Sequence, residues 1–133
     1  MVVDVDVPRP GGDLGAQWEV VEAFMAAARG GDFTALVAVL DPDVVLRADG
    51  GLTDLTHRVR GAEAVASQAI MWSRVDLTVK RSLVNGAAGL VAMRAGVPFS
   101  VMAITVREAR IVELDILADP ERVGRLDFTV LDD

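Results

Sequence analysis

Three two-residue turn signals in the second half of the chain constrain its fold most strongly. Asn85-Gly86 is a strong hairpin signal, and Ala95-Gly96 and Glu108-Ala109 mark two further turns. The apolar or alternating runs around them have the length of strands, at Asp76–Leu83, Gly89–Arg94, Pro98–Val106 and Ile111–Leu117. Because strands joined by such short turns must be antiparallel, we expect a four-stranded antiparallel meander.

The first half of the chain has a different period, which predicts helices. Apolar residues recur at helical spacing from Ala16 to Ala28, and Gly30-Gly31 ends the pattern. Asp32 is a good N-cap for a second, shorter helix that ends before Pro42. A third helix is expected over Glu63–Trp72.

The segment between the second and third helices predicts a strand and a loop. Val44–Leu46 has the composition of a short strand, and the polar run that follows to Arg60 is expected to be a loop. This loop starts with Asp49-Gly50-Gly51 and carries the single histidine, His57. Helices followed by antiparallel strands predict an α+β domain, a cone-like half-open barrel whose curved, mainly antiparallel sheet packs around three N-terminal helices.

The two ends of the chain differ from this pattern. Residues 1–15 contain Pro8, Pro10, Gly11 and Gly12 and are expected to be a flexible lead-in to a domain over residues 16–125. Ala118–Arg125 predicts a helical turn with proline at its first position. Residues 126–133 are expected to form a tail or an edge strand.

Composition excludes several classes of function. The chain has 133 residues, enough for one core, and no cysteine, which excludes thiol catalysis and cysteine-ligated metals. Its 13 basic and 20 acidic residues give a net charge of −7, which argues against direct nucleic-acid binding. Its apolar runs are too short for a membrane helix, so we expect a cytoplasmic protein. One histidine among scattered aspartates predicts neither a metal site nor a cofactor.

Three segments resemble the SnoaL-like branch of the nuclear transport factor 2-like superfamily. They are Val20–Leu55 (VVEAFMAAARGGDFTALVAVLDPDVVLRADGGLTDL), Arg60–Ala66 (RGAEAVA) and Ile104–Arg122 (ITVREARIVELDILADPER). More narrowly, the chain is similar to the C-terminal SnoaL-like extension of bacterial extracytoplasmic-function sigma factors. The resemblance implies a non-catalytic regulatory or ligand-sensing domain, with sigma-factor regions or RNA polymerase as partners.

The resemblance also implies an interaction surface made of two segments. Asp49, Gly50 and Gly51 match the family's Asp-Gly-Gly-Gly loop, although Leu52 stands at the third glycine. Pro120 matches an Asn-Pro-Asp-Lys-Leu-like segment whose other positions are here Asp119, Glu121, Arg122 and Val123. A plain turn and a helix cap are the structural alternatives for these two segments.

The same superfamily contains polyketide cyclases and ketosteroid isomerases, so an enzyme acting on a hydrophobic ring substrate is the alternative. Such an enzyme needs a base and a donor for the developing enolate oxygen. The chain has no tyrosine, and apolar Val101 stands where an isomerase-like strand would carry its protonated aspartate. Asp49 and His57 remain as catalytic candidates, and Glu113 and Asp115 are expected on the outer face of the last strand.

A cavity inside the cone is the expected site for a small hydrophobic ligand. Val112, Leu114 and Ile116 alternate onto the inner face of the last strand. The outer face of the sheet is the expected contact of a homodimer. The cavity lining is predicted to include Trp18, Met25, Val101, Leu114 and Ile116, with core packing as the alternative for Trp18, Met25 and Trp72.

Overall fold

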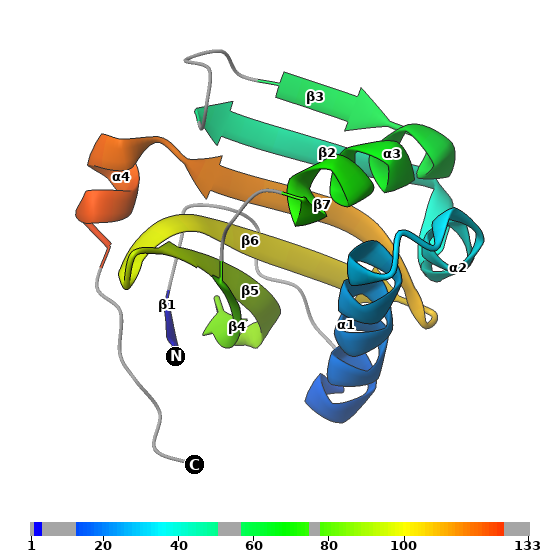
Figure 1. The fold of residues 1–133 in the computed structure, drawn as a ribbon. Helices are drawn as coiled ribbons and strands as arrows, with labels where there is room; N and C mark the ends of the chain where they lie inside the picture. Colours follow the sequence, from blue (N-terminus) through cyan, green and yellow to red (C-terminus); the bar gives the residue numbers. More distant parts are fainter. Residues whose placement is uncertain (1, 4–12, 51–56, 75–77, 127–133) are drawn as a thin grey trace.

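The computed structural model describes residues 2–3, 13–50, 57–74 and 78–126, which form a curved sheet around a layer of helices (Figure 1). The helices are α1 (Leu14–Arg29), α2 (Phe33–Val39), α3 (Ala62–Ser73) and α4 (Pro120–Gly124). The strands are β1 (Val2–Val3), β2 (Leu40–Gly50), β3 (His57–Arg60), β4 (Thr78–Val84), β5 (Ala87–Arg94), β6 (Val97–Arg107) and β7 (Arg110–Ala118). The predicted α+β cone is confirmed.

The seven strands form one mixed sheet in the order β1-β4-β5-β6-β7-β2-β3. The meander from β4 to β7 is antiparallel throughout, as the turn signals predict. Two pairings are parallel: β2 lies beside β7, and β1, within the expected lead-in, lies beside β4. The parallel β2–β7 pair brings Asp49 next to Leu117 and Gly50 next to Ala118, at the end of the sheet where α4 begins.

The three hairpin turns share one backbone conformation. Both residues of each turn have positive φ, at 54° and 78° in Asn85-Gly86, 51° and 79° in Ala95-Gly96, and 50° and 63° in Glu108-Ala109. Two positive φ values are the mark of a type I′ turn, whose twist matches that of the flanking strands. The meander is therefore determined locally, one hairpin at a time.

Two predictions around β2 were wrong. This strand runs over eleven residues from Leu40 to Gly50, longer than the predicted Val44–Leu46. His57–Arg60 is a strand, β3, and not part of a loop; residues 51–56 of that predicted loop lie outside the described residues. Both differences have the same cause, because these residues gain their strand conformation by pairing with distant partners, β7 on one side of β2 and β3 on the other.

The sheet separates two apolar clusters. The inner cluster fills the cone between the helices and the sheet and includes Val21, Phe24, Leu36, Ile111 and Leu114. The outer cluster lies on the other face, where Leu126, from the expected tail, packs against a buried group of five side chains. That group comprises Val84, Val91, Met93, Val101 and Ala103.

Candidate functional site

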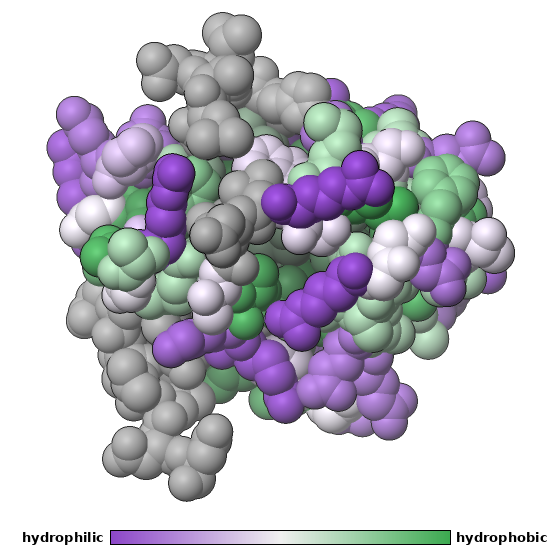
Figure 2. All heavy atoms as spheres, in the orientation of Figure 1, coloured by the Kyte–Doolittle hydropathy of each residue, from purple (hydrophilic) through white to green (hydrophobic). Residues whose placement is uncertain are grey.

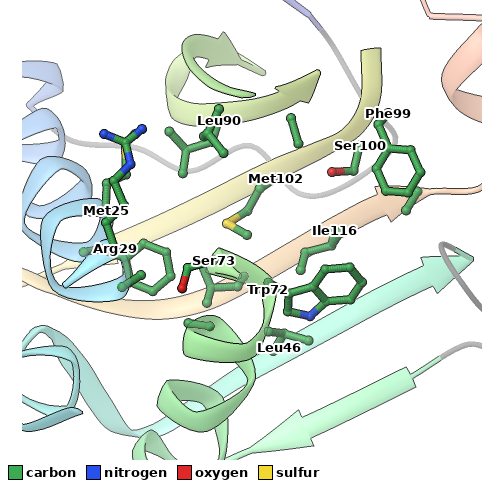
Figure 3. A pocket seen from close by; sticks show the side chains of 17 residues that line it. Met25, Arg29, Leu46, Trp72, Ser73, Leu90, Phe99, Ser100, Met102 and Ile116 are labelled. Carbon is green, nitrogen blue, oxygen red and sulfur yellow. The ribbon is translucent and has the colours of Figure 1, made fainter. Parts of the chain in front are cut away.

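A pocket of about 170 Å³ opens into the cone between α1, α3 and the inner face of the sheet (Figure 3). Its described lining has seventeen residues, and fourteen of them are apolar. The polar ones are Arg29, Ser73 and Ser100. In the orientation of Figure 1, the space-filling view shows apolar surface in a central hollow between hydrophilic side chains (Figure 2).

The helical wall of the pocket comes from the ends of two helices. Met25 and Arg29 lie one turn apart on α1, close to its end at Gly30. Trp72 and Ser73 end α3, and the Ser73 hydroxyl donates to the Ile70 carbonyl at 2.7 Å. Figure 3 shows Arg29 and Met25 at one end of the pocket, away from Trp72.

The opposite wall is formed by alternating residues of the sheet. Ser100 and Met102 of β6 and Leu114 and Ile116 of β7 line the pocket. Phe99 joins them because the register between β5 and β6 shifts beside it, a β-bulge that re-aims side chains locally. The Ser100 hydroxyl makes no hydrogen bond within the part of the chain that the structure describes, and Figure 3 shows it beside the cavity.

Met25, Leu114 and Ile116 therefore line the pocket, whereas Val101 and Trp18 do not. Val101 is on the outer face of β6, since the inward residues of this strand are Ser100 and Met102. The prediction that Val101 lines the cavity was displaced by one residue along the strand. Because side chains alternate between the two faces of a strand, a displacement of one residue changes the face. Trp18 lies on the side of α1 that faces β4, where the Arg81 guanidinium covers its ring at 4.3 Å from the centroid.

A second register shift changes the inner face of β7. Thr105 pairs with Glu113 and Val106 with Ile111, so Val112 has no direct partner on β6. Fully buried Ile111 consequently joins the inner cluster in the place predicted for Val112. Alternation read from the sequence cannot locate such a bulge, because the extra residue is only visible against the neighbouring strand.

The two segments of the predicted interaction surface lie side by side. The Arg122 guanidinium forms an ion pair with Asp49, and both side chains are partly exposed. The Asp119 carboxylate caps α4 by accepting hydrogen bonds from the backbone N–H groups of Glu121 at 2.9 Å and Arg122 at 3.4 Å. Gly50 ends β2 beside this pair, and Gly51 lies outside the described residues.

The carboxylates of β7 face away from the pocket, together with a basic residue of β2. Arg47 contacts Asp115 at 3.2 Å and Glu113 at 3.5 Å, and these carboxylates raise the pKa of its guanidinium. Partial burial raises the pKa of Asp115 above its ordinary value, although the hydrogen bond from Arg47 opposes this shift. Glu113 and Asp115 thus share a face, as the period of two predicts, and neither lines the pocket.

Of the two catalytic candidates, Asp49 is described in full and does not belong to the described pocket lining. Asp49 alternates with inward Leu46 and Ala48 of β2 and pairs with Arg122 instead. His57 lies opposite Ala48 in the register of β3, and its side chain is outside the described part of the structure. Among the described residues, no group of three or more histidine, aspartate or glutamate side chains is placed to hold a metal ion.

Comparison with solved structures decides the fold family. An NTF2-like protein of unknown function from Mesorhizobium loti has a TM-score of 0.62 and 17% identity, covering 84% of this chain and 97% of that one. This chain has the NTF2-like fold. An epoxide hydrolase of the LEH-like type from Mycobacterium tuberculosis shares it at a TM-score of 0.57 and 22% identity, with 86% of this chain and 90% of that chain covered.

A sigma factor also contains this fold, and its sequence identity to this chain is higher than that of the two proteins above. The extracytoplasmic function sigma factor SigJ of Mycobacterium tuberculosis is 29% identical at a TM-score of 0.61, over 80% of this chain. This chain matches 43% of the length of the sigma factor. No family model and no curated protein matches the sequence. No helix in the described residues is long and apolar enough to cross a membrane.

Proposed function

We propose that this domain is a non-catalytic, ligand-sensing member of its fold family that binds a small hydrophobic molecule in the pocket between α1, α3 and the sheet. The observation that carries this proposal is the lining, in which apolar side chains predominate and a few polar groups converge. An apolar cavity of about 150 Å³ holds benzene in another protein, so about 170 Å³ suits one ring with a short substituent. A cytoplasmic location is part of the proposal.

The size of the pocket limits the affinity. A ligand of about ten non-hydrogen atoms, at about −0.4 kcal/mol per atom, binds with about −4 kcal/mol. This free energy corresponds to a dissociation constant of about 1 mM. Tighter binding would require additional contacts beyond those of the apolar walls.

The arrangement of carboxylates supports binding over catalysis. A general base must come within about 2.6–3.2 Å of the proton that it removes. The described pocket lining has no carboxylate or imidazole, and Asp49, Glu113 and Asp115 belong to ion pairs on the other face. An enzyme acting on a hydrophobic ring substrate, the alternative, would need a base from outside this lining.

The test is an NMR titration of ¹⁵N-labelled protein with 4-ethylbenzamide, a neutral one-ring probe. We expect shifts of the Leu90, Met102 and Ile116 amides, and their loss in Ala69→Phe, which places a ring in the pocket. Ala26→Phe is the matched control, because Ala26 is exposed on α1 and does not line the pocket. Shifts that persist in Ala69→Phe, or none in the unmodified protein, would contradict the proposal.

A second candidate function is a regulatory contact with a sigma factor or RNA polymerase. It is favoured by the 29% identity to SigJ and by the Asp49–Arg122 ion pair, which joins the two segments that the family resemblance singles out. The contact would be made by Asp49, Gly50, Gly51 and the Asp119–Arg122 segment.

Glu121 is the best position for testing this contact. Asp49 and Asp119 are unsuitable because they hold an ion pair and a helix cap, so their loss would also lower stability. Glu121→Lys reverses an exposed charge instead. We expect it to abolish capture of purified sigma-factor regions, with a melting temperature within about 2 °C of the unmodified protein. The control is Glu63→Lys, because Glu63 is likewise an exposed acidic residue in the first turn of a helix, α3. Equal capture by both variants would reject this candidate.

A further inference from the structure

We infer that the pocket selects hydrophobic ligands that carry a negative charge, and that Arg29 is their anion partner. The ligand class is a small carboxylate with an apolar body of about one ring. This inference rests on the proposed ligand-binding function and specifies its ligand.

The charge of the pocket is the first observation. Arg29 is the one charged residue in the described lining, and it forms no ion pair with a described carboxylate. Arg47, Arg81 and Arg122 are each paired with an acidic side chain, and among the other described basic residues Arg29 is the one that lines this pocket. In a chain with a net charge of −7, a basic group without such a partner at the mouth of an apolar pocket is available to an anionic ligand.

The position of Arg29 at the end of α1 has a structural explanation as well. A cation in the last turn of a helix is stabilised by the helix dipole. That effect explains why a basic residue is found in this turn. It would stabilise a basic side chain that points away from the pocket just as well as one that lines it. The contribution of Arg29 to the pocket wall is therefore a separate feature.

The layout of the pocket fits an elongated amphiphile. Figure 3 shows Arg29 at the α1 end, with Trp72 and Phe99 at the other end and Leu90 and Met102 between them. A guanidinium has a planar fork of donors that matches both oxygens of a carboxylate. A ligand lying along the pocket would thus place its carboxylate on Arg29 and its apolar body against the sheet.

Ser100 adds a second reason for a ligand with a polar group. Its hydroxyl is on the sheet wall and has no hydrogen-bond partner among the described residues. A purely apolar ligand would cover this hydroxyl and leave it without water, which is unfavourable. A second polar substituent, at the end of the ligand that faces β6, would accept its hydrogen bond while the carboxylate binds Arg29.

The experiment compares two probes of equal shape, 4-ethylbenzoate and 4-ethylbenzamide, by NMR titration of the full chain at low salt. We expect the carboxylate to bind about fivefold more tightly than the amide, as an ion pair near the surface can provide. Arg29→Gln should remove this preference, and Arg29→Lys should retain part of it. Arg107→Gln, an exposed arginine outside the pocket lining, should leave the preference unchanged.

The possible outcomes separate the two proposals. If both probes bind the unmodified protein equally, the charge selection is wrong while ligand binding stands. If the preference for the carboxylate survives in Arg29→Gln, another group binds the anion and the assignment to Arg29 is overturned. If neither probe shifts the pocket amides, ligand binding itself fails. A preference that 0.5 M salt reduces would further support an ion pair.

Discussion

Gly89 lies where β5 is packed closely against both of its neighbouring strands, β4 and β6. It lies on β5 between Ser82 of β4 and Ala103 of β6. A Cβ atom built on Gly89 would be 2.6 Å from Val84 Cγ2 and 2.7 Å from the Met102 carbonyl oxygen. Both distances are too short for a real Cβ atom, and the carbonyl belongs to the backbone of β6, so Gly89→Ala must displace a strand.

We expect Gly89→Ala to lower the free energy of unfolding by about 2 kcal/mol. Overpacking of a buried site costs about 1–3 kcal/mol, and the backbone contact favours the upper part of this range. The loss of glycine flexibility in the unfolded chain offsets about 0.4–1 kcal/mol. For a domain of this size, the net effect lowers the melting temperature by about 7 °C.

Urea unfolding followed by circular dichroism measures the change directly. Gly124→Ala is the matched control, because its Cβ would meet no atom within 4 Å and its φ is not positive. This control should raise the free energy of unfolding by about 0.4–1 kcal/mol, because it loses the flexibility of glycine without a clash. A Gly89→Ala protein as stable as Gly124→Ala would refute the close packing of β5 against β6.

Two electrostatic predictions concern the outer face. Arg47→Met should raise the pKa of Asp115 further and cost about 1 kcal/mol of stability at pH 7, with a smaller loss at pH 4. A raised carboxyl pKa means that the native state binds more protons than the unfolded chain. The free energy of unfolding therefore falls as the pH rises through the pKa of the folded state. An equal loss of stability at pH 4 and pH 7 would contradict this reasoning. For the Asp49–Arg122 pair, a double-mutant cycle of Asp49→Asn and Arg122→Gln should give a coupling of about 0.2–1 kcal/mol in urea unfolding. Strict additivity would show that the pair is not formed.

The features that were predicted correctly depend on neighbouring residues in the chain. Asp32 caps α2 through a hydrogen bond from the Ala35 N–H, and Asp119 caps α4, as their positions in the sequence indicate. The Asn85-Gly86 turn adopts positive φ at both residues, which sets the register of β4 against β5. These choices require no distant contact.

The features that were missed depend on distant partners. The full length of β2 and the existence of β3 result from strand pairing across the sheet. Trp18 has helical spacing in α1, but only the packed structure shows that Arg81 of β4 covers it. The position of Arg29 in the pocket wall was also missed, because a basic residue in the last turn of a helix looks like an ordinary helix end.

The sequence by itself determined the order of helices and strands, the hairpin turns and the absence of thiol chemistry, because these follow from local backbone preferences and residue types. Only the tertiary structure decided which residues face the pocket. The period of two assigns faces along an unbroken strand, but the bulges beside Phe99 and Val112 shift the alternation, and they arise from how β6 fits its neighbours. Tertiary packing therefore puts Ser100 and Met102 in the pocket wall, places Val101 behind the sheet, and brings Asp49 to Arg122.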